Sequence, residues 1–344
     1  MKKVKMNKRL YAVALLISLI LLLSACKQSG AASGGAPRTP FIGGTAGITI
    51  NFEKDSPPPE VTDDESFSFR TIMRLKNDGE TKVDKNNMKI NLVGVDPQDF
   101  GASTEDVREQ VPEDDMDSKK RDAEGNIIEG TTTFASFPKA NSDFTIPRKF
   151  SGNTEFTFRA NVCYAYETRA TTKLCILRDM INIRDNGLCK PTQGRTIYSS
   201  SAPVQATNLR ESVIGKDKIA FSFDISLNGN VDIFRDSSDT TPTSGFDAAC
   251  PSDPRARRQV ENRVKVEITT TGDPVVTNTK CGGLDSGDRG TITLVSGKRT
   301  LTCTADLDPD RVDLEKTFDI TLSYNVLDSK ETKVLVKHLA ETIS

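Results

Sequence analysis

A strict alternation of apolar and polar residues is the feature that most constrains the fold of this chain. Between Ile219 and Leu227, apolar side chains at every second position alternate with small or acidic ones, and Asn228-Gly229 follows directly. A period of two places the apolar side chains on one face of a β-strand, and an Asn-Gly pair is typical of the turn that ends it. The segment from Phe67 to Leu75 has a similar pattern and is followed by Asn77-Asp78-Gly79. The sequence therefore predicts half-buried strands closed by polar turns.

Further strand-like segments occur at regular spacing, and turns rich in Gly, Pro and Asp separate them. Helical periodicity is absent beyond the N-terminal segment. Short strands at this spacing are typical of antiparallel β-sandwiches, so the predicted fold class is all-β, with two tandem immunoglobulin-like sandwiches. The other strand candidates are residues 47–52, 88–93, 131–137, 156–166, 173–177, 204–209, 264–269, 291–295, 299–304, 317–326 and 332–339.

The length of the chain predicts two domains, because about 300 residues remain after the signal peptide and exceed what one core usually organises. The motif FSF occurs at 67–69 and again at 221–223, each time before an apolar run and an Asn/Gly turn, which indicates two copies of one domain type. We expect the first sandwich at residues 41–185, a linker at 186–200 and the second sandwich at 201–344. Residues 101–130 are highly charged and nearly free of apolar side chains, which predicts a long, mobile surface loop.

The N-terminus has the composition of an export signal. Basic residues between Lys2 and Arg9 precede an uncharged, apolar stretch from Leu10 to Ala25. This stretch is shorter than the roughly 20 residues of a membrane span, and its order of basic, apolar and small residues is that of a signal peptide. Leu23-Ser24-Ala25-Cys26 resembles the lipobox of bacterial and archaeal lipoproteins. The resemblance implies that residues 1–25 are removed and that Cys26 carries a diacylglyceryl group. The alternative is an uncleaved anchor helix, which also places the rest of the chain outside the cytoplasm.

Residues 26–40 predict a tether between the lipid and the folded part, because those after Cys26 are small and polar without apolar periodicity. A flexible segment of this length has a root-mean-square reach of about 20 Å, which leaves the folded part near the membrane but free to tilt. Lys27 follows the lipidated cysteine, so the aspartate that retains some lipoproteins in the inner membrane is absent. The expected location is the cell surface, on the outer face of the cytoplasmic membrane, with the membrane as partner through the lipid on Cys26.

The charge of the chain argues against a nucleic-acid partner. The formal net charge is −2, and it becomes −7 once the five basic residues of the signal peptide are removed. Nucleic-acid binding relies on a basic surface, so this balance disfavours it.

Six cysteines other than Cys26 predict a disulfide set, because an even count in an exported chain reads as a framework of bridges. Six cysteines allow 15 pairings, so the sequence leaves the connectivity open. Neighbourhood in the sequence favours Cys163 with Cys175 across a hairpin and Cys281 with Cys303, which leaves Cys189 with Cys250. Zinc ligation is the rival interpretation, but no two cysteines have C-x₂₋₄-C spacing and no histidine accompanies them.

No catalytic residues are predicted, and no cofactor is expected. Nucleophilic catalysis by Ser or Cys generally needs a base, and the only histidine, His338, sits in an alternating segment typical of a strand surface or edge. The chain contains no G-x-S-x-G, P-loop or H-E-x-x-H motif.

Clustered charges supply the remaining site candidates. Carboxylates gather at 63–65, at 113–117 and at 306–313, and solvated turns are the simplest explanation for all three clusters. If calcium binds, we favour the DLDPDRVD loop with Asp306, Asp308 and Asp310, because its acids alternate, although the D-x-D-x-D-G pattern is missing. Arg255, Arg257 and Arg258 are expected in a solvated loop, with an anionic partner as the alternative.

Several segments carry a resemblance to a known group of proteins. GGTAGITINF (43–52) with the PPPEV that follows, FSFRTIMRLKNDGE (67–80), VGVDPQDFG (93–101) and NVCYAYETRATTKLCI (161–176) resemble lipid-anchored surface proteins of small-genome archaea. The strand that ends in NDG also resembles the CARDB and NEW3 type of immunoglobulin-like domain on prokaryotic cell surfaces. The resemblance implies an extracellular β-sandwich module and brings no catalytic residues with it.

Two functions follow as expectations. The first is a structural, adhesion or surface-assembly module without catalytic activity, whose partners are other envelope or surface proteins. The second is a solute- or polymer-binding lipoprotein accessory to a membrane transporter, although a chain without Trp and with five Tyr offers few side chains for sugar stacking.

Overall fold

The structure is a computed structural model that describes residues 39–64, 67–139, 142–184, 187–236, 240–272 and 274–339. The predicted signal peptide, Cys26 and the tether up to residue 38 lie outside the described residues. Residues 40–344 form one compact unit, and everything below concerns that unit alone. No helix within the described ranges has both the length and the apolar character needed to span a bilayer.

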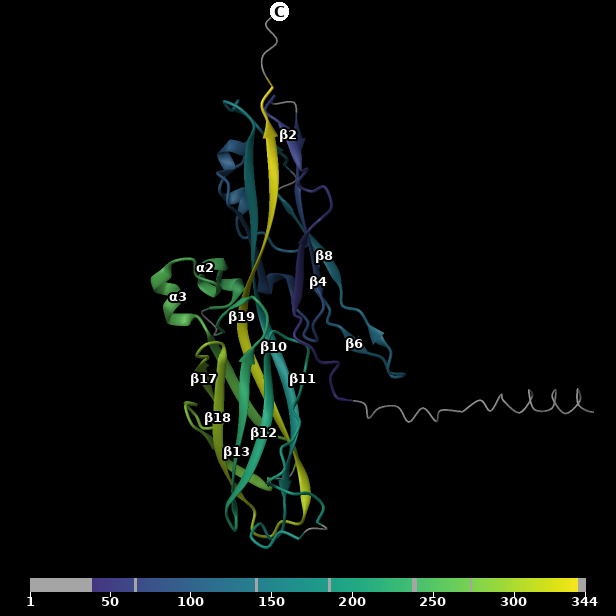
Figure 1. Cartoon of the computed structure of the whole chain (residues 1–344), viewed down its shortest axis with the longest axis vertical. Coiled ribbons are helices and arrows are strands. Elements are labelled where there is room, and N and C mark those ends of the chain that lie inside the picture. Colours follow the sequence, from purple (N-terminus) through teal and green to yellow (C-terminus); the bar gives the residue numbers. More distant parts are fainter. Residues whose placement is uncertain are drawn as a thin grey trace, which may run out of the picture. The chain divides into compact units, whose positions relative to one another are not determined.

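Two long antiparallel strands form the backbone of the fold (Figure 1). β10 (Thr154–Ile176) and β19 (Leu314–Lys337) pair without a break, from Thr154 opposite Val336 to Ile176 opposite Leu314. The 23 residues of β10 extend over roughly 75 Å at about 3.3 Å per residue. One of these strands comes from the first half of the chain and the other from the second, so the two halves share a sheet.

The large sheet around this pair has the strand order β11–β10–β19–β15–β17. Three more strands add to its sides: β5 pairs with β10, and β14 and β2 pair with β19. All of these pairings are antiparallel except β2 with β19. The added strands are β2 (Glu60–Thr62), β5 (Met88–Val93), β11 (Tyr198–Ser199), β14 (Asp232–Arg235), β15 (Arg263–Thr270) and β17 (Arg289–Thr293).

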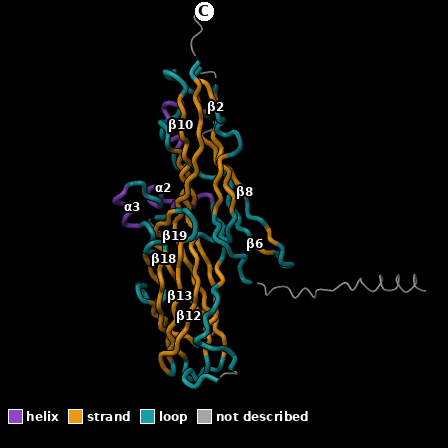
Figure 2. Tube along the Cα trace, viewed as in Figure 1, coloured by secondary structure: helices purple, strands orange, loops and turns teal. Residues whose placement is uncertain are grey.

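Two smaller antiparallel sheets complete the two-layered arrangement, and strands dominate the whole trace (Figure 2). A four-stranded sheet has the order β12–β13–β18–β16, and a three-stranded sheet has the order β1–β4–β8. Their bounds are β12 (Val204–Gly215), β13 (Lys218–Leu227), β18 (Lys298–Leu307), β16 (Val276–Cys281), β1 (Ile48–Phe52), β4 (Thr71–Asn77) and β8 (Thr132–Phe137). Two-stranded pairs are formed by β3 (Ser68–Phe69) with β9 (Phe144–Thr145) and by β6 (Lys120–Arg121) with β7 (Ile127–Ile128).

Aromatic side chains pack the sheets against each other. Phe221 and Phe223 of β13 meet Phe318 of β19, with ring centroids 4.8 and 6.2 Å apart, in edge-to-face geometry. In the other part of the unit, Phe158 of β10 packs edge-on against Phe100 at 5.1 Å, within a cluster that also contains Phe69 and Phe144. Both groups belong to one continuous cluster of buried apolar residues. The all-β prediction is therefore confirmed, with sheets stacked as in β-sandwiches.

The strands predicted from alternation end at the predicted turns. β13 covers the Ile219–Leu227 run and stops before Asn228-Gly229, and β4 stops at Asn77. Asn77 is buried, and its side-chain oxygen accepts a hydrogen bond from the Gly79 amide at 3.1 Å. A Cβ at Gly79 would lie 1.8 Å from the Tyr166 hydroxyl, so only glycine fits this turn.

Two of the predicted strand breaks are wrong. The candidates at 156–166 and 173–177 are one strand, β10, and those at 317–326 and 332–339 are parts of one strand, β19. Polar and charged residues in the middle of each segment suggested turns. Each strand instead continues because the other supplies a hydrogen-bonding partner along its whole length.

The charged segment at 101–130 is more ordered than the loop that its composition predicts. Val107 and Met116 are buried within it, and the backbone of Met116 exchanges two hydrogen bonds with Val83. The segment also contains the β6–β7 pair. A few apolar side chains with backbone pairing therefore fasten this segment to the core despite its charge.

Short helices connect the strands. α2 (Phe246–Ala249) and α3 (Pro254–Val260) are too brief to produce a visible periodicity in the sequence. The 3₁₀ turns are η1 (Lys85–Asn87), η2 (Pro97–Phe100), η3 (Glu105–Val107) and η4 (Pro242–Ser244). The division into sandwiches at 41–185 and 201–344 stays a prediction, although the β10–β19 pair runs across it.

Candidate interaction site at the stapled loop end

Three disulfides join the six cysteines beyond Cys26. They pair Cys163 with Cys250, Cys175 with Cys189 and Cys281 with Cys303, with sequence separations of 87, 14 and 22 residues. The prediction for Cys281–Cys303 is confirmed, because these residues are direct neighbours on β16 and β18. A disulfide framework as such is also confirmed.

The other two predicted pairings are wrong. Cys163 and Cys175 lie on the same uninterrupted strand, and their separation of 12 positions spans roughly 40 Å of extended chain. Disulfides join Cα atoms that lie only about 4.4–6.8 Å apart, so the two cannot pair. Cys163 instead meets Cys250 just after α2, where both are buried, and Cys175 meets Cys189 across the loop that follows β10.

The Cys175–Cys189 bridge closes a loop at one end of the β10–β19 pair. In this loop, Asp179 accepts hydrogen bonds from the amides of Ile181 and Asn182, both at 3.0 Å. These bonds to the carboxylate lower the pKa of Asp179. The Leu177 amide also donates to the sulfur of Met180, at 3.3 Å. Hydrogen bonds therefore order residues 177–182 of the loop, and the disulfide closes it.

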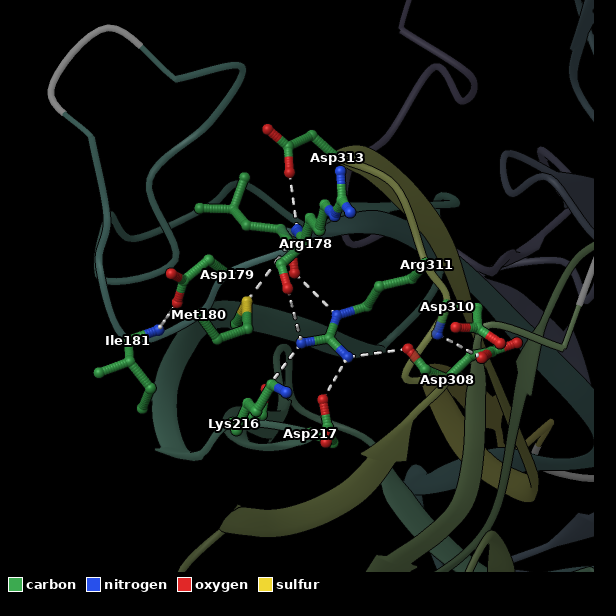
Figure 3. Close-up of polar contacts among 11 residues, drawn as sticks. Arg178, Asp179, Met180, Ile181, Lys216, Asp217, Asp308, Asp310, Arg311 and Asp313 are labelled. Atoms are coloured by element: carbon green, nitrogen blue, oxygen red, sulfur yellow. Dashed lines mark hydrogen bonds and ion pairs between the residues drawn. The ribbon is translucent and has the colours of Figure 1, made fainter.

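A buried arginine holds this loop against two neighbouring turns (Figure 3). The side chain of Arg311 has no exposed surface. Its Nε donates to the Leu177 carbonyl at 2.7 Å, and its Nη2 donates to the Lys216 carbonyl at 2.6 Å. Its Nη1 donates to the Asp308 carbonyl and to the Asp217 carboxylate, both at 2.8 Å. One guanidinium thus joins the segments after β10, between β12 and β13, and between β18 and β19.

Two open hollows adjoin this loop end. One, of about 990 Å³, is lined by residues of the stapled loop together with Lys216, Val312 and Asp313. The other, of about 540 Å³, is lined by Pro40, Leu188 and Cys189 and by residues of β10, β11 and β19. A further hollow of about 830 Å³ lies along β15 and β16. Among the residues that line these three, only Tyr198 is aromatic.

The calcium candidates do not converge. Asp306 bonds to Lys218 and Asn278, at 3.3 and 3.0 Å, and Asp308 accepts from the Asp310 amide at 2.9 Å. Within the described ranges, no three His, Cys, Asp or Glu side chains are placed to share a metal ion. Asp308 therefore bonds within its own turn, whereas Asp306, in β18, bonds to residues of the neighbouring strands β13 and β16.

His338 and Asp63 form a partly buried polar contact at the other end of β19. Nδ1 of His338 lies 2.8 Å from Oδ2 of Asp63, which is fully buried. Asp63 also accepts from the amides of Leu339 and Phe150, both at 2.9 Å. The hydrogen bond from His338 and these amides hold the pKa of the Asp63 carboxyl well below its usual range. These contacts fasten the end of β19 to the segment after β2.

The three arginines expected in a loop lie on α3 instead. Arg257 pairs with Asp232 and Glu261, at 2.8 and 3.1 Å, and covers the ring of Phe234 at 5.1 Å. Arg255 and Arg258 are exposed. Arg257 is therefore engaged within the fold, and an anionic partner for these arginines stays a prediction.

Sequence reasoning missed Glu211, a buried acid beside the stapled loop. It is 5% exposed, and its Oε2 accepts from the Cys175 amide at 2.8 Å. Burial raises the pKa of Glu211 to about 7, against the opposing effects of that amide and of nearby Arg195. Its Oε1 and Nε of Arg195 have no hydrogen-bond partner within the described structure. A bulge at Asn208, where φ is +59°, turns Glu211 inward, and the asparagine was the only sequence signal for it.

The fold and its three bridges define the chain as an all-β protein stapled by disulfides. No protein-family model and no curated protein sequence matches it. A crystal structure of a serine-rich repeat adhesion glycoprotein from Streptococcus agalactiae aligns with 85% of this chain and 96% of its own, at 11% identity and a TM-score of 0.13. A TM-score this low does not establish a common fold, so the alignment carries no argument.

Proposed function

We propose that the chain is a lipid-anchored structural or adhesion module on the outer face of the cytoplasmic membrane, without catalytic activity. The pairing of the cysteines carries this proposal. All six cysteines beyond Cys26 bond with each other, which leaves Cys26 as the one thiol available for lipid. Disulfides of this number are typical of exported proteins, as the lipobox-like Leu23-Ser24-Ala25-Cys26 requires.

The arrangement of the site supports a binding role for the module. Loops at the end of a stacked pair of sheets are common contact surfaces, because a rigid scaffold positions them. Here the Cys175–Cys189 bridge and Arg311 fix such a loop end. The alternative, solute or polymer binding for a transporter, is less well supported, because only Tyr198 offers an aromatic ring in the three hollows.

Lipid labelling tests the anchor. The native chain, expressed in a lipoprotein-processing host with a labelled fatty acid, should incorporate the label and partition into detergent. Cys26→Ala should abolish incorporation of the label, because the thioether cannot form. Ser29→Ala, three residues further on, is the matched control and should leave labelling unchanged. Label that persists in the Cys26→Ala variant would falsify the proposal.

A further inference from the structure

Exposed aliphatic side chains gather at the stapled loop end. Ile181 is 60% exposed, Leu188 64%, Val312 66% and Ile183 38%. We call these four residues the apolar tip. Ile181 and Val312 line the same hollow of about 990 Å³, together with Gly187, the neighbour of Leu188. Single exposed aliphatic residues are ordinary on a protein surface, but a group of them at one end of the fold marks a contact surface.

The apolar tip is held in its exposed position. Asp179 fixes the backbone of Ile181 through its amide, and the Cys175–Cys189 bridge fixes the segment next to Leu188. Arg311, the residue before Val312, is the buried arginine that joins the loops. Ile181, Leu188 and Val312 are therefore each fixed directly or through a neighbouring residue, and their side chains are exposed to solvent.

Pro40, from which the chain leads back to the predicted lipid, lines a hollow with one residue of the apolar tip, Leu188. Pro40, Leu188 and Cys189 line one hollow, next to residues 171–173 of β10. Cys26 is 14 positions before Pro40, and a flexible segment of that length has a root-mean-square reach of about 20 Å. A lipid on Cys26 would hold Pro40, and the side of the fold that Pro40 shares with Leu188, near the membrane while leaving the protein free to tilt.

Charges around the tip are nearly balanced. Arg178, Arg184 and Lys216 line the adjoining hollow, and Asp179 and Asp313 line it too. Both acids accept hydrogen bonds from loop amides, Asp313 from that of Arg178 at 2.6 Å. A balanced rim neither requires nor repels anionic lipid, so the burial of aliphatic side chains would supply the attraction to the bilayer.

We propose that the apolar tip inserts into the interfacial layer of the bilayer that carries the Cys26 lipid. Apolar side chains on a polar protein bury themselves at the boundary of headgroups and acyl chains, about 5–10 Å deep. This second contact fixes how the protein stands, because the lipid alone leaves it free to tilt. The opposite end of the β10–β19 pair would then point away from the membrane, and its loops would meet partners. The inference rests on the proposed lipid anchor.

Tryptophan fluorescence tests the insertion, because the chain contains no tryptophan. Val312→Trp and Ile181→Trp each place a single probe on the tip of the lipidated, full-length mature protein. Val295→Trp is the matched control, since Val295 is 65% exposed but lies in the turn before β18, at the end of that strand away from Asp308. In vesicles of brominated phosphatidylcholine, both tip probes should lose about half of their emission, and the control should keep nearly all of it.

The outcomes separate this inference from the proposed function. Protein that does not float with the vesicles refutes the lipid anchor and the insertion together. Protein that floats but shows equal emission from tip and control probes refutes the insertion alone. A tip probe whose emission shifts to the blue without bromine quenching is covered by protein, such as a second copy, and this too overturns the proposal. Circular dichroism of each variant checks that the fold is intact, and the two tip positions serve as replicates.

Discussion

Glu211 is the residue at which burial and charge conflict most clearly. Its carboxyl lies inside the fold with one hydrogen bond, from the Cys175 amide, and its pKa rises from 4.5 to about 7. The folded state therefore holds a proton that the unfolded chain releases between these two values. The contribution of Glu211 to stability is fully present below pH 4.5 and is lost as pH rises towards 7, by on the order of 3 kcal/mol.

Glu211→Gln should remove this pH dependence, because an amide does not titrate. Urea titrations at pH 4.5 and pH 8 measure the free energy of unfolding. Between these pH values it should fall by about 3 kcal/mol more for the native protein than for the variant. Asp224→Asn is the control, and it should keep the native pH dependence between pH 4.5 and pH 8. Hydrogen bonds from Thr300 and Asn208 lower the pKa of Asp224 to about 2, so it stabilises the fold above pH 4 and this contribution fades only in stronger acid. Equal pH profiles for the native and Glu211→Gln proteins would contradict the burial argument.

At the residue scale, the sequence predicted which side chains of a strand face inward, but it predicted only one of the three disulfide pairings, Cys281 with Cys303. The inward positions of β13, such as Phe221 and Phe223, follow from alternation alone, because one face of the strand is buried. Glu211 escaped the same rule because a bulge shifts the parity of β12 just before it. The disulfide partner of Cys163 was not predicted either, because it depends on which segments become neighbours in space.

At the scale of elements, one arginine stabilises three connecting segments. Arg311→Ala should lower the free energy of unfolding by about 3 kcal/mol or more, because carbonyls of Leu177, Lys216 and Asp308 lose a buried donor. Denaturant titration measures this effect. Arg258→Ala, an exposed change on α3, is the matched control and should stay within about 0.5 kcal/mol.

A second variant, Asp217→Asn, separates the contribution of the carbonyl contacts of Arg311 from that of its ion pair with Asp217. Asp217 is 37% exposed, so Asp217→Asn should cost no more than about 1 kcal/mol. An Arg311→Ala loss as small as that of Arg258→Ala would show that the three segments hold together without the guanidinium. A loss for Asp217→Asn as large as that for Arg311→Ala would assign the effect to the ion pair instead.

Element boundaries were predictable where a local signal fixes them. The turn at Asn77-Asp78-Gly79 ends β4 because the Asn77 side chain bonds within the turn and Gly79 fits against Tyr166. The length of β10 was not predictable. Whether a polar stretch such as 167–173 turns or continues depends on a partner strand some 150 positions away, and the local sequence does not encode that partner. The charged segment at 101–130 was misjudged for a similar reason, because its anchor Met116 bonds to distant Val83.

At the scale of the whole molecule, the pairing of β10 with β19 determines whether the two halves of the chain unfold together or separately. β10 and β19 pass through the full length of the large sheet, and one continuous apolar cluster includes Phe158 on one side and Phe223 on the other. Two independent sandwiches at 41–185 and 201–344 would each have their own core and their own transition. A shared sheet and a shared core couple the two parts, so calorimetry should record a single unfolding transition.

Paired core substitutions test this coupling. Phe158→Ala and Phe223→Ala each leave a cavity that costs about 3–5 kcal/mol, and both should lower the midpoint of the same transition. Ile127→Ala, at a position that is 50% exposed, is the control and should leave the midpoint in place. Two peaks, with Phe158→Ala moving one and Phe223→Ala moving the other, would show that the halves unfold independently. In that case the β10–β19 pair would be a junction between two domains, and the division predicted from the sequence, into sandwiches at 41–185 and 201–344, would be correct.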